Sequence, residues 1–495
     1  MLPKWFIFKL SVYFPEYTQK KRLKKILSEL QNIDLKNFQY QVPKDYEDYS
    51  GDISKIISGN LTVLTKTVPL LLEPTGGSSG GTKLIPYTKS LKEEFQYAID
   101  PWLVELFIKY PALFFGQQYW SITPSTKANT KSEIPVGFQS DTDYLNSIQR
   151  NFSQNIFPVP SSLQRCNDFE TVLFLTLLFL INTPHLRFIS VWHPSMLLIM
   201  TDTLKKRFDE LLNSLETGVL PKDIKPYFSF KTNKKRVKLL RKTSYKPALI
   251  WKNIRVISCW AGNDKQYWID RIKEIFPQAK IQPKGLIATE GITSIPLCRK
   301  QNVLAICSHF YEFETDQGKI ISFEELQKGQ TYHLLLTTSG GFVRYKTHDL
   351  VKVRDFYHKL PCLEFITRNN YTSDVFGEKI SLKQAEEICR RIPCKFSFAM
   401  IAPEKIKNGY RYVLYIDTDD HIYPEDFLER ELCKNLHYQH ARNIGQLQKS
   451  VTKKVSNPVK KINSYARECN QQVGSIKYSA LSLEMNWNNI FDAEL

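Results

Sequence analysis

The stretch EPTGGSSGGTKLIPYT, residues 73–88, places four glycines and two serines between two short apolar segments. The segments VPLLL before it and LIP after it are typical of short strands, so the glycine-rich stretch is predicted to form the loop of a hairpin. Glycine lets several backbone N–H groups converge on an anion, and Thr75, Ser78 and Lys83 add hydroxyl donors and a positive charge. The residues fit a phosphate group, and a flexible surface linker is the alternative.

The residues that follow the glycines exclude an ordinary P-loop. Gly76 and Gly81 have the G-x-x-x-x-G spacing, but that motif continues with Lys and then Ser or Thr, whereas Thr82, Lys83 and Leu84 follow here. The loop alone therefore does not identify the phosphate compound.

Length and composition indicate a globular protein with more than one domain. The chain has 495 residues, 42% of them hydrophobic, and includes 30 Phe and 25 Tyr. At the usual domain size this predicts roughly two to four domains. The nine cysteines are dispersed and never spaced C-x-x-C, so neither a disulfide framework nor a zinc site is indicated. We expect a cytoplasmic monomer.

Neither a membrane nor a nucleic acid is an expected partner. The N-terminal segment MLPKWFIFKLSVYF contains Lys4 and Lys9 and lacks a cleavage site, so it is not typical of a signal peptide. The most apolar run, VLFLTLLFLI at residues 172–181, is about half of the ~20 residues that cross a bilayer, and we interpret it as a buried helix. The net charge is +18, but no nucleic-acid module surrounds the lysine runs. The charge is compatible with anionic small molecules.

The residue pattern of the second half of the chain changes at two points. From residue 251 short apolar runs alternate with turns and one helix at 265–276, a pattern typical of a mixed α/β core. The predicted strands are 255–260, 285–289, 302–306, 332–338, 341–345 and 351–354. From residue 374 the chain is more polar, with predicted helices at 382–391 and 425–435 and a strand at 410–417. We therefore predict a large domain at 1–372 and a small α+β domain at 373–495, joined near RNNYTS, residues 368–373.

Three further segments combine charge with predicted strands or turns. They are GLIATEGI (285–292), FYEF (310–313) and GGFVRYKTHDLVKV (340–353). We interpret the first as a strand running into a polar turn and the last as a hairpin with one inward Asp. Taken singly, Glu290 fits a capping carboxylate, Asp349 a salt-bridged turn residue and Arg344 a paired charge.

In this order and spacing the motifs resemble the auxin-responsive acyl acid amido synthetase family, within the acyl-adenylate-forming superfamily, and we identify a bacterial-type member. TGGSSGGTKLIP is similar to the family's S-G-T-S-x-G-x-x-K-L-I-P phosphate loop, ATEG to its second nucleotide motif, and GGFVRYKTHDLVKV to its G-L-Y-R-Y-R-x-G-D-V-V-x-V hairpin. Lesser similarities lie at VWHPS (191–195), FITR (365–368), GEKIS (377–381) and GSIKYSAL (474–481). His348 stands where the family usually has Gly, and Gly77 replaces a hydroxyl residue. If that Gly has a positive φ, His tolerates the conformation better than most residues.

The resemblance implies an α/β fold: a large N-terminal adenylate-forming domain with mixed β-sheets and packed helices, and a small α+β C-terminal lid domain. It also implies ATP and Mg²⁺. The residues it assigns to ATP are Thr75, Gly76, Gly77, Ser78 and Lys83 at the phosphates, Ala288, Thr289 and Glu290 beside the adenine and the metal, Asp349 at the ribose hydroxyls and Arg368 at the domain join. Two lysines of the C-terminal domain are assigned to catalysis, Lys477 at the α-phosphate and Lys379 at the start of that domain. Glu290 offers the hard oxygen that Mg²⁺ prefers.

The implied activity is a two-step ligase reaction that forms a carbon–nitrogen bond. A carboxylic acid attacks ATP to give an acyl-adenylate and pyrophosphate, and an amine, an amino acid by expectation, then attacks the activated carbonyl. One alternative transfers the acyl group to a thiol or hydroxyl. Another is a degenerate adenylate-binding protein without enzymatic activity.

Overall fold

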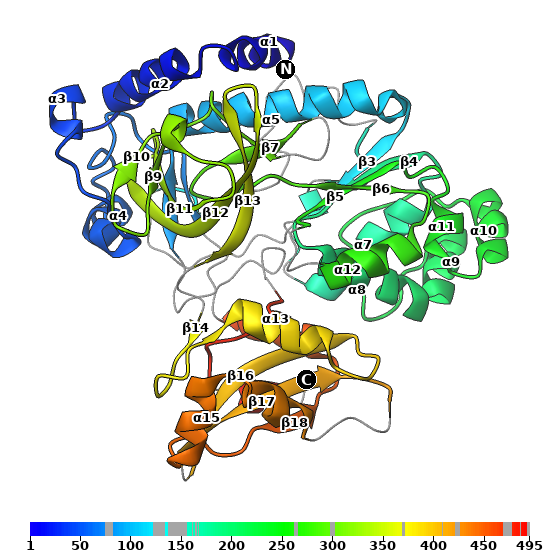
Figure 1. Cartoon of the computed structure of the whole chain (residues 1–495). Helices are drawn as coiled ribbons and strands as arrows, with labels where there is room; N and C mark the ends of the chain where they lie inside the picture. Colours follow the sequence, from blue (N-terminus) through cyan, green and yellow to red (C-terminus); the bar gives the residue numbers. More distant parts are fainter. Residues whose placement is uncertain are drawn as a thin grey trace. The chain divides into compact units, whose positions relative to one another are not determined.

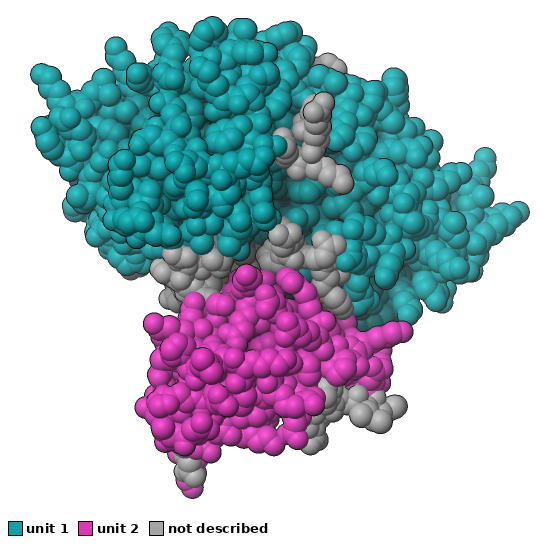
Figure 2. Space-filling view, viewed as in Figure 1, with its two compact units in different colours: residues 1–75, 83–366 teal, residues 76–82, 367–495 magenta. Residues whose placement is uncertain are grey.

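The computed structural model describes residues 1–74, 83–121, 134–136, 156–160, 162–163, 166, 168–261, 266–297, 302–368, 372–407, 409–420, 426–468, 478–485 and 487–492. The chain divides into two compact units (Figure 2). Unit 1 comprises Met1–Thr75 and Lys83–Ile366, and unit 2 comprises Gly76–Thr82 and Thr367–Leu495. The predicted domain boundary between residues 372 and 373 stays a prediction.

Unit 1 contains a hairpin and two larger sheets (Figure 1). The hairpin consists of β1 (Leu71–Pro74) and β2 (Leu84–Tyr87), which pair antiparallel with Leu71 opposite Tyr87 and Pro74 opposite Leu84. This pairing confirms the hairpin predicted on either side of the glycine-rich stretch. The stretch itself, residues 75–82, lies outside the described residues.

A seven-stranded sheet has the order β10-β9-β11-β12-β13-β8-β7. Its strands are β7 (Ser294–Pro296), β8 (Asn302–Leu304), β9 (Phe310–Glu314), β10 (Ile320–Ile321), β11 (Thr331–Thr337), β12 (Tyr345–Tyr357) and β13 (Leu360–Arg368). The pairs β9–β11 and β11–β12 are antiparallel, as is usual for strands that are connected without a crossover helix.

A four-stranded parallel sheet has the order β3-β4-β5-β6. Its strands are β3 (Gln117–Trp120), β4 (Leu186–Ser190), β5 (Val256–Cys259) and β6 (Lys280–Pro283). Parallel strands need crossover connections, and helices supply them here. The helices of unit 1 are α1 (Leu2–Ser11), α2 (Pro15–Glu29), α3 (Leu35–Phe38), α4 (Ser50–Ile57), α5 (Lys89–Lys109), α7 (Phe169–Ile181), α8 (Pro194–Lys206), α9 (Phe208–Thr217), α10 (Lys234–Leu240), α11 (Pro247–Ile250) and α12 (Gln266–Ile275).

Helix α7 is the predicted buried helix, and its ends are satisfied by side chains. Asp168 accepts a hydrogen bond from the Thr171 N–H at 3.0 Å and so caps the N-terminus. At the other end, Trp251 Nε1 donates to the Leu180 carbonyl at 2.8 Å, and Arg236 Nε donates to the Ile181 carbonyl at 2.8 Å. A helix that is apolar on all sides needs such partners because its terminal carbonyls lie away from water. No helix among the described residues has the length and hydropathy to cross a membrane.

Unit 2 is an α+β structure around a three-stranded sheet of order β16-β17-β18. Its strands are β14 (Thr372–Ser373), β15 (Ile380–Ser381), β16 (Phe398–Ile406), β17 (Gly409–Asp417) and β18 (Val451–Lys454). Its helices are α13 (Leu382–Arg390), α14 (Phe427–Leu432), α15 (Leu436–Asn443), α16 (Pro458–Glu468) and α17 (Trp487–Asp492). The predicted α+β class, the helix at 382–391 and the strand at 410–417 are confirmed.

Candidate active site

Lys83 lies directly before β2, and its ammonium group faces an aromatic ring. Its Nζ is 5.1 Å from the centre of the Tyr46 ring. The Tyr46 hydroxyl accepts from the Leu84 N–H at 2.7 Å and donates to the Leu84 carbonyl at 3.2 Å. Tyr46 belongs to the 3₁₀ helix η1 (Tyr46–Tyr49), so this earlier segment holds the end of the hairpin loop. The other predicted phosphate residues, Thr75, Gly76, Gly77 and Ser78, lie outside the described residues.

Two carboxylates act electrostatically on the Tyr46 hydroxyl. Burial raises the pKa of Tyr46 above its usual value, the hydrogen bond with the Leu84 backbone opposes the rise, and the carboxylates of Glu47 and Glu290 add to it. Glu290 itself is 5% exposed. Lys83 and Glu290, assigned from separate motifs to phosphate and metal, therefore act on the same phenol.

Residues 285–292 form a tight reversal instead of the predicted strand at 285–289. The Ala288 N–H donates to the Gly291 carbonyl at 3.0 Å, and Ile287 pairs with Ile292 in an isolated bridge. The Leu286 carbonyl accepts from the N–H groups of Thr293 and Ser294, so backbone groups of this segment pair with residues close in sequence instead of joining a strand ladder. A Cβ on Gly285 would lie 1.8 Å from the Ser294 carbonyl oxygen, so only glycine fits this approach.

The turn carries Ala288, Thr289 and Glu290 and is tied to the hairpin. The Tyr87 hydroxyl, at the end of β2, donates to the Thr289 carbonyl at 2.7 Å. Two of the three predicted nucleotide motifs are thereby joined by one hydrogen bond. Within the described residues no group of three or more His, Cys, Asp or Glu side chains could hold a metal ion. One carboxylate with substrate phosphates is a common way to hold Mg²⁺, so this absence does not conflict with the assignment of Glu290.

Asp349 lies on a bulge in β12. His333 of β11 pairs with Leu350 and Leu335 pairs with Lys346, so residues 347–349 all lie opposite the single residue Leu334. Because β12 has two more residues than β11 at this point, its side chains keep the same alternation between buried and more exposed positions on both sides of the bulge. Asp349 is only 5% exposed. Its N–H donates to Thr347 Oγ1 at 3.2 Å.

His348, the departure from the family's usual Gly, has a φ of +61°. His is among the residues enriched in this conformation, although glycine adopts it without strain. Its Nε2 lies 2.7 Å from Asp45 Oδ1, and Asp45 is the N-cap residue of the helix that contains Tyr46. The substituted side chain thus links the bulge to the segment that holds Lys83.

Arg344 is engaged by a carboxylate of the neighbouring strand. Its Nε donates to Glu312 Oε2 at 2.9 Å and its Nη2 donates to Glu312 Oε1 at 2.8 Å. The sequence interpretation of Arg344 as a paired charge is confirmed. The segment 340–353 is the connection between β11 and β12 followed by part of β12, and it is not a hairpin by itself; the predicted strand at 341–345 is wrong for the same reason.

The remaining predicted residues belong to unit 2 or its edge. Arg368 is the last residue of β13, and Lys477 lies outside the described residues. Lys379 is exposed and has a φ of +47°. The preceding Glu378 is fully buried and accepts hydrogen bonds from the Val375 N–H, the Phe376 N–H and the Tyr412 hydroxyl at 2.8, 2.7 and 2.5 Å. A fixed turn therefore presents Lys379.

Sequence reasoning did not identify Tyr46, Asp45 or Glu378 as parts of these sites. Residues 42–55 are mostly polar, and the contacts of Tyr46 depend on a hairpin that lies later in the chain. The single available signal was the run of alternating Tyr and acidic residues, DYEDY, at 45–49. In unit 1 the structure brings together Lys83, Thr289, Glu290 and, through His348, the bulge that carries Asp349.

The chain is similar to known proteins over most of its length. The chain matches the sequence profile of the GH3 family N-terminal domain over residues 15–281 and that of the GH3 family central domain over residues 302–368. Indole-3-acetic acid-amido synthetase GH3.4 of Arabidopsis thaliana is 22% identical in an alignment 506 positions long, which covers 88% of this chain and 84% of that protein. The 4-substituted benzoates-glutamate ligase GH3.12 of the same plant is 20% identical, over 71% of this chain and 66% of that protein.

The fold is that of the acyl acid amido synthetases. The solved structure of the GH3.15 acyl acid amido synthetase superposes with a TM-score of 0.82 at 18% sequence identity, covering 99% of this chain and 96% of that one. The profile of the N-terminal domain alone spans more than half of the 495 residues. The chain belongs to the GH3 family, which confirms the resemblance drawn from the three motifs.

Proposed function

We propose that this protein is an ATP-dependent acyl acid amido synthetase. It would activate a small carboxylic acid as an acyl-adenylate and transfer the acyl group to an amine, an amino acid by expectation. The observation that carries the proposal is that, in a GH3-family chain, described residues from three nucleotide motifs lie in one region of unit 1: Lys83, the turn with Thr289 and Glu290, and the bulge with Asp349. The two curated relatives described above form amides from indole-3-acetic acid and from 4-substituted benzoates, so the family position supports the reaction class and leaves the acid open.

The described residues have the chemistry that such a site needs. Lys83 is a point cation for phosphate oxygens, and its position over Tyr46 fixes where that charge lies. Asp349, on its bulge, is an acceptor for both hydroxyls of a ribose when it is ionised. Thr75, Gly76, Gly77 and Ser78 are assigned to the phosphates, Ala288 and Thr289 to the adenine, and Arg368 to the nucleotide, each by family resemblance.

Mg²⁺ is part of the proposal. Glu290 is the carboxylate that would hold it, and the ion would neutralise charge on the phosphates. Replacing Glu290 with Gln should raise the Mg²⁺ concentration that gives half-maximal pyrophosphate release, because an amide oxygen is a weaker ligand than a carboxylate. A Mg²⁺ titration that is identical for wild type and Glu290→Gln contradicts this assignment.

The function is tested by screening carboxylic acids for ATP-dependent pyrophosphate release. At least one acid should release pyrophosphate with the wild-type protein, and Lys83→Ala should slow that release with the same acid. Amines, thiols and hydroxyl compounds are then added, and the acceptor that accelerates AMP release identifies the second step. ATP binding without pyrophosphate release from any acid would instead favour the degenerate adenylate-binding protein.

A further inference from the structure

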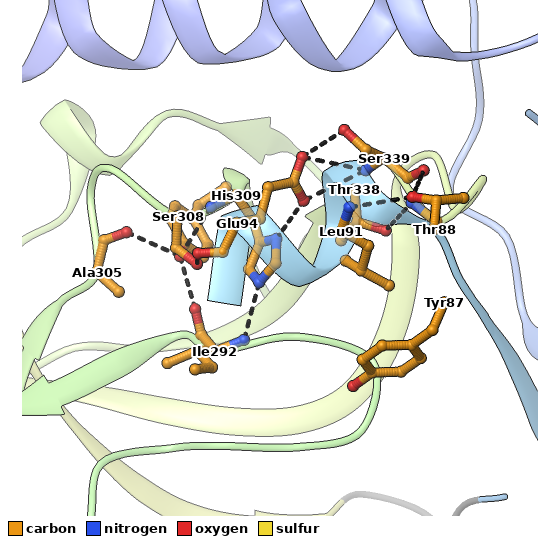
Figure 3. A network of polar contacts seen from close by, with 12 residues as sticks. Tyr87, Thr88, Leu91, Glu94, Ile292, Ala305, Ser308, His309, Thr338 and Ser339 are labelled. Atoms are coloured by element: carbon orange, nitrogen blue, oxygen red, sulfur yellow. Dashed lines mark hydrogen bonds and ion pairs between the residues drawn. The ribbon is translucent and has the colours of Figure 1, made fainter. Parts of the chain in front are cut away.

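A buried carboxylate on α5 lies behind the candidate nucleotide site. Glu94 is 2% exposed and contacts two segments that are far from it in the sequence (Figure 3). One of its oxygens accepts a hydrogen bond from the Ser339 hydroxyl, and both oxygens lie 3.3 Å from the Ser339 nitrogen. Its Oε2 is also 2.8 Å from Nδ1 of His309, which is fully buried. Glu94 therefore connects the residue directly before β9 with the turn before Gly340.

The hydrogen bonds define the protonation of His309. Its Nε2 accepts from the Ile292 N–H at 3.0 Å, so this nitrogen carries a lone pair and Nδ1 carries the proton that is donated to Glu94. Ile292 closes the turn that holds Ala288, Thr289 and Glu290. The ring also contacts this turn directly, because a Cβ on Gly291 would lie 3.0 Å from Nε2.

A chain of hydrogen bonds continues from Ser339 back to the turn. The Ser339 carbonyl accepts from Thr88 Oγ1 at 3.0 Å, and Thr88 caps α5 by accepting from the Leu91 N–H at 3.0 Å. The preceding residue, Tyr87, donates to the Thr289 carbonyl. The hairpin, the 285–292 turn and the 338–344 connection into β12 are thus joined in one set of contacts. Figure 3 shows its centre, where Glu94 lies between His309 and Ser339.

We propose that Glu94 and His309 are positioning residues for ATP. They fix the 285–292 turn and the 338–344 connection relative to the hairpin. As a result, Glu290, Asp349 and Lys83 can bind the same nucleotide. This inference rests on the proposed function. Neither residue has to touch ATP, because supporting hydrogen bonds are what hold binding side chains in a productive geometry. A buried polar network has this effect only while every member is satisfied.

Glu94→Gln tests the network with almost no change in shape. The amide of the variant side chain can adopt two arrangements. If its oxygen faces Ser339, its NH₂ group opposes the Nδ1–H of His309; if its oxygen faces His309, its NH₂ group lies at Ser339 and the Ser339 hydroxyl loses its acceptor. Either arrangement weakens one of the two links, to the 285–292 turn or to the 338–344 connection. We expect the Kd for ATP, measured by calorimetry without an acid, to rise about tenfold, as for a buried hydrogen bond that is left unmade.

Glu105→Gln is the matched control. Glu105 lies on the same helix, is 7% exposed, and accepts from Trp5 Nε1 at 2.9 Å and from Lys9 at 3.3 Å, both on α1. This variant should lose thermal stability to a similar degree and keep the wild-type affinity for ATP. An equal loss of ATP affinity in both variants, or no loss in a folded Glu94→Gln protein, overturns the proposal.

A pair of His309 variants decides the matter if Glu94→Gln does not fold. In His309→Asn the new amide replaces Nδ1 and keeps the contact with Glu94, whereas in His309→Gln the new amide replaces Nε2 and keeps an acceptor for the Ile292 N–H. Positioning predicts weaker ATP binding in His309→Asn than in His309→Gln; the reverse order, or equal affinities, overturns it.

If the wild type binds ATP but releases no pyrophosphate, the proposed function fails while the binding comparison still tests Glu94. If the wild type does both and all variants bind ATP equally, only the positioning proposal fails.

Discussion

Two extra residues in β12 decide how Asp349 is presented. The bulge at residues 347–349 leaves the ladder with β11 intact on either side, and it buries a carboxylate at a point where a regular strand would continue its hydrogen bonds. Bulges often re-aim a side chain next to a binding site, so the position of Asp349 in this bulge fits a ligand-binding role.

Asp349→Ala should weaken ATP binding by about 1.5–3 kcal/mol, the usual contribution of hydrogen bonds to a charged group. Adenylation, followed by pyrophosphate release at fixed ATP, should fall below detection because the ribose also orients the α-phosphate. Asp355→Ala is the control on the same strand, since Asp355 is half-exposed and pairs with Lys328 at 2.9 Å. Normal ATP affinity in a folded Asp349→Ala protein would remove the ribose assignment.

His348 shows how a departure from the family sequence is accommodated. Its φ of +61° costs a β-branched residue more than it costs His or Gly. His348→Val should therefore lower the free energy of unfolding by ~1–3 kcal/mol, and His348→Gly by less, because glycine relieves the strain while losing the contact with Asp45. Urea denaturation of the three proteins measures the order, and a Val variant as stable as the Gly variant would show that the conformation is not strained.

Local sequence signals located elements whose hydrogen bonds are local. The hairpin β1–β2, helix α7, strand β17 and helix α13 each have a periodicity and flanking turn residues that are visible in one short window. The predicted strand at 285–289 failed because its apolar residues close a turn. The strand β12 was predicted only at 351–354, because the polar residues KTHD at 346–349 interrupt its apolar pattern. Glu94 had no signal at all, since its partners His309 and Ser339 are more than two hundred residues away.

The Glu429 carboxylate joins several elements of unit 2 and makes the stability of that unit depend on pH. Glu429 on α14 accepts from Arg442 Nε at 2.6 Å, from the Tyr438 hydroxyl at 2.9 Å and from the Ser450 N–H and hydroxyl at 2.8 and 2.7 Å. Burial alone would raise the pKa of Glu429, but the hydrogen bonds from Arg442, Ser450 and Tyr438 outweigh it and lower the pKa below its usual value. These bonds join α14 to α15 and to the start of β18.

Because the folded-state pKa of Glu429 is lowered, its stabilisation is present above the pKa of an unfolded Glu, near 4.3, and is lost as the pH falls below that value. Glu429→Gln should be less stable than the wild type at pH 7, and the difference should shrink as the pH falls from about 5 toward 3. Hydrogen exchange of peptides from α14, α15 and β18 in the full chain reports this locally. Glu484→Gln, at an exposed carboxylate of the same unit, should show little difference at either pH. A constant difference for Glu429→Gln across this range would contradict the assignment.

For the whole molecule, the sequence predicted two domains and an α/β class before any contact was known. The structure divides after Ile366 and the central-domain profile ends at residue 368, whereas the predicted join at 368–373 rested on turn-forming residues. A single sequence can place such a join only through its polar composition. A single sequence does not show how groups of one unit approach a substrate bound to the other. The roles of Lys379 and Lys477 are therefore assigned by family resemblance.

The two half-reactions separate the roles of these lysines. If residues 373–495 act as a lid, as predicted, the cation that stabilises charge at the α-phosphate is needed while the carboxylate attacks ATP, and that charge has dispersed once the acyl-adenylate exists. Lys477→Ala should then lose acid-dependent pyrophosphate release and keep most of the amide formation from a synthetic acyl-adenylate. Lys379→Ala is the paired variant, because the turn fixed by Glu378 presents its exposed side chain. Loss of the first half-reaction in Lys379→Ala alone would transfer the role to Lys379. Equal loss of both half-reactions in Lys477→Ala would instead indicate a structural role, since a phosphate-directed cation has no reason to slow the attack of an amine on a preformed acyl-adenylate.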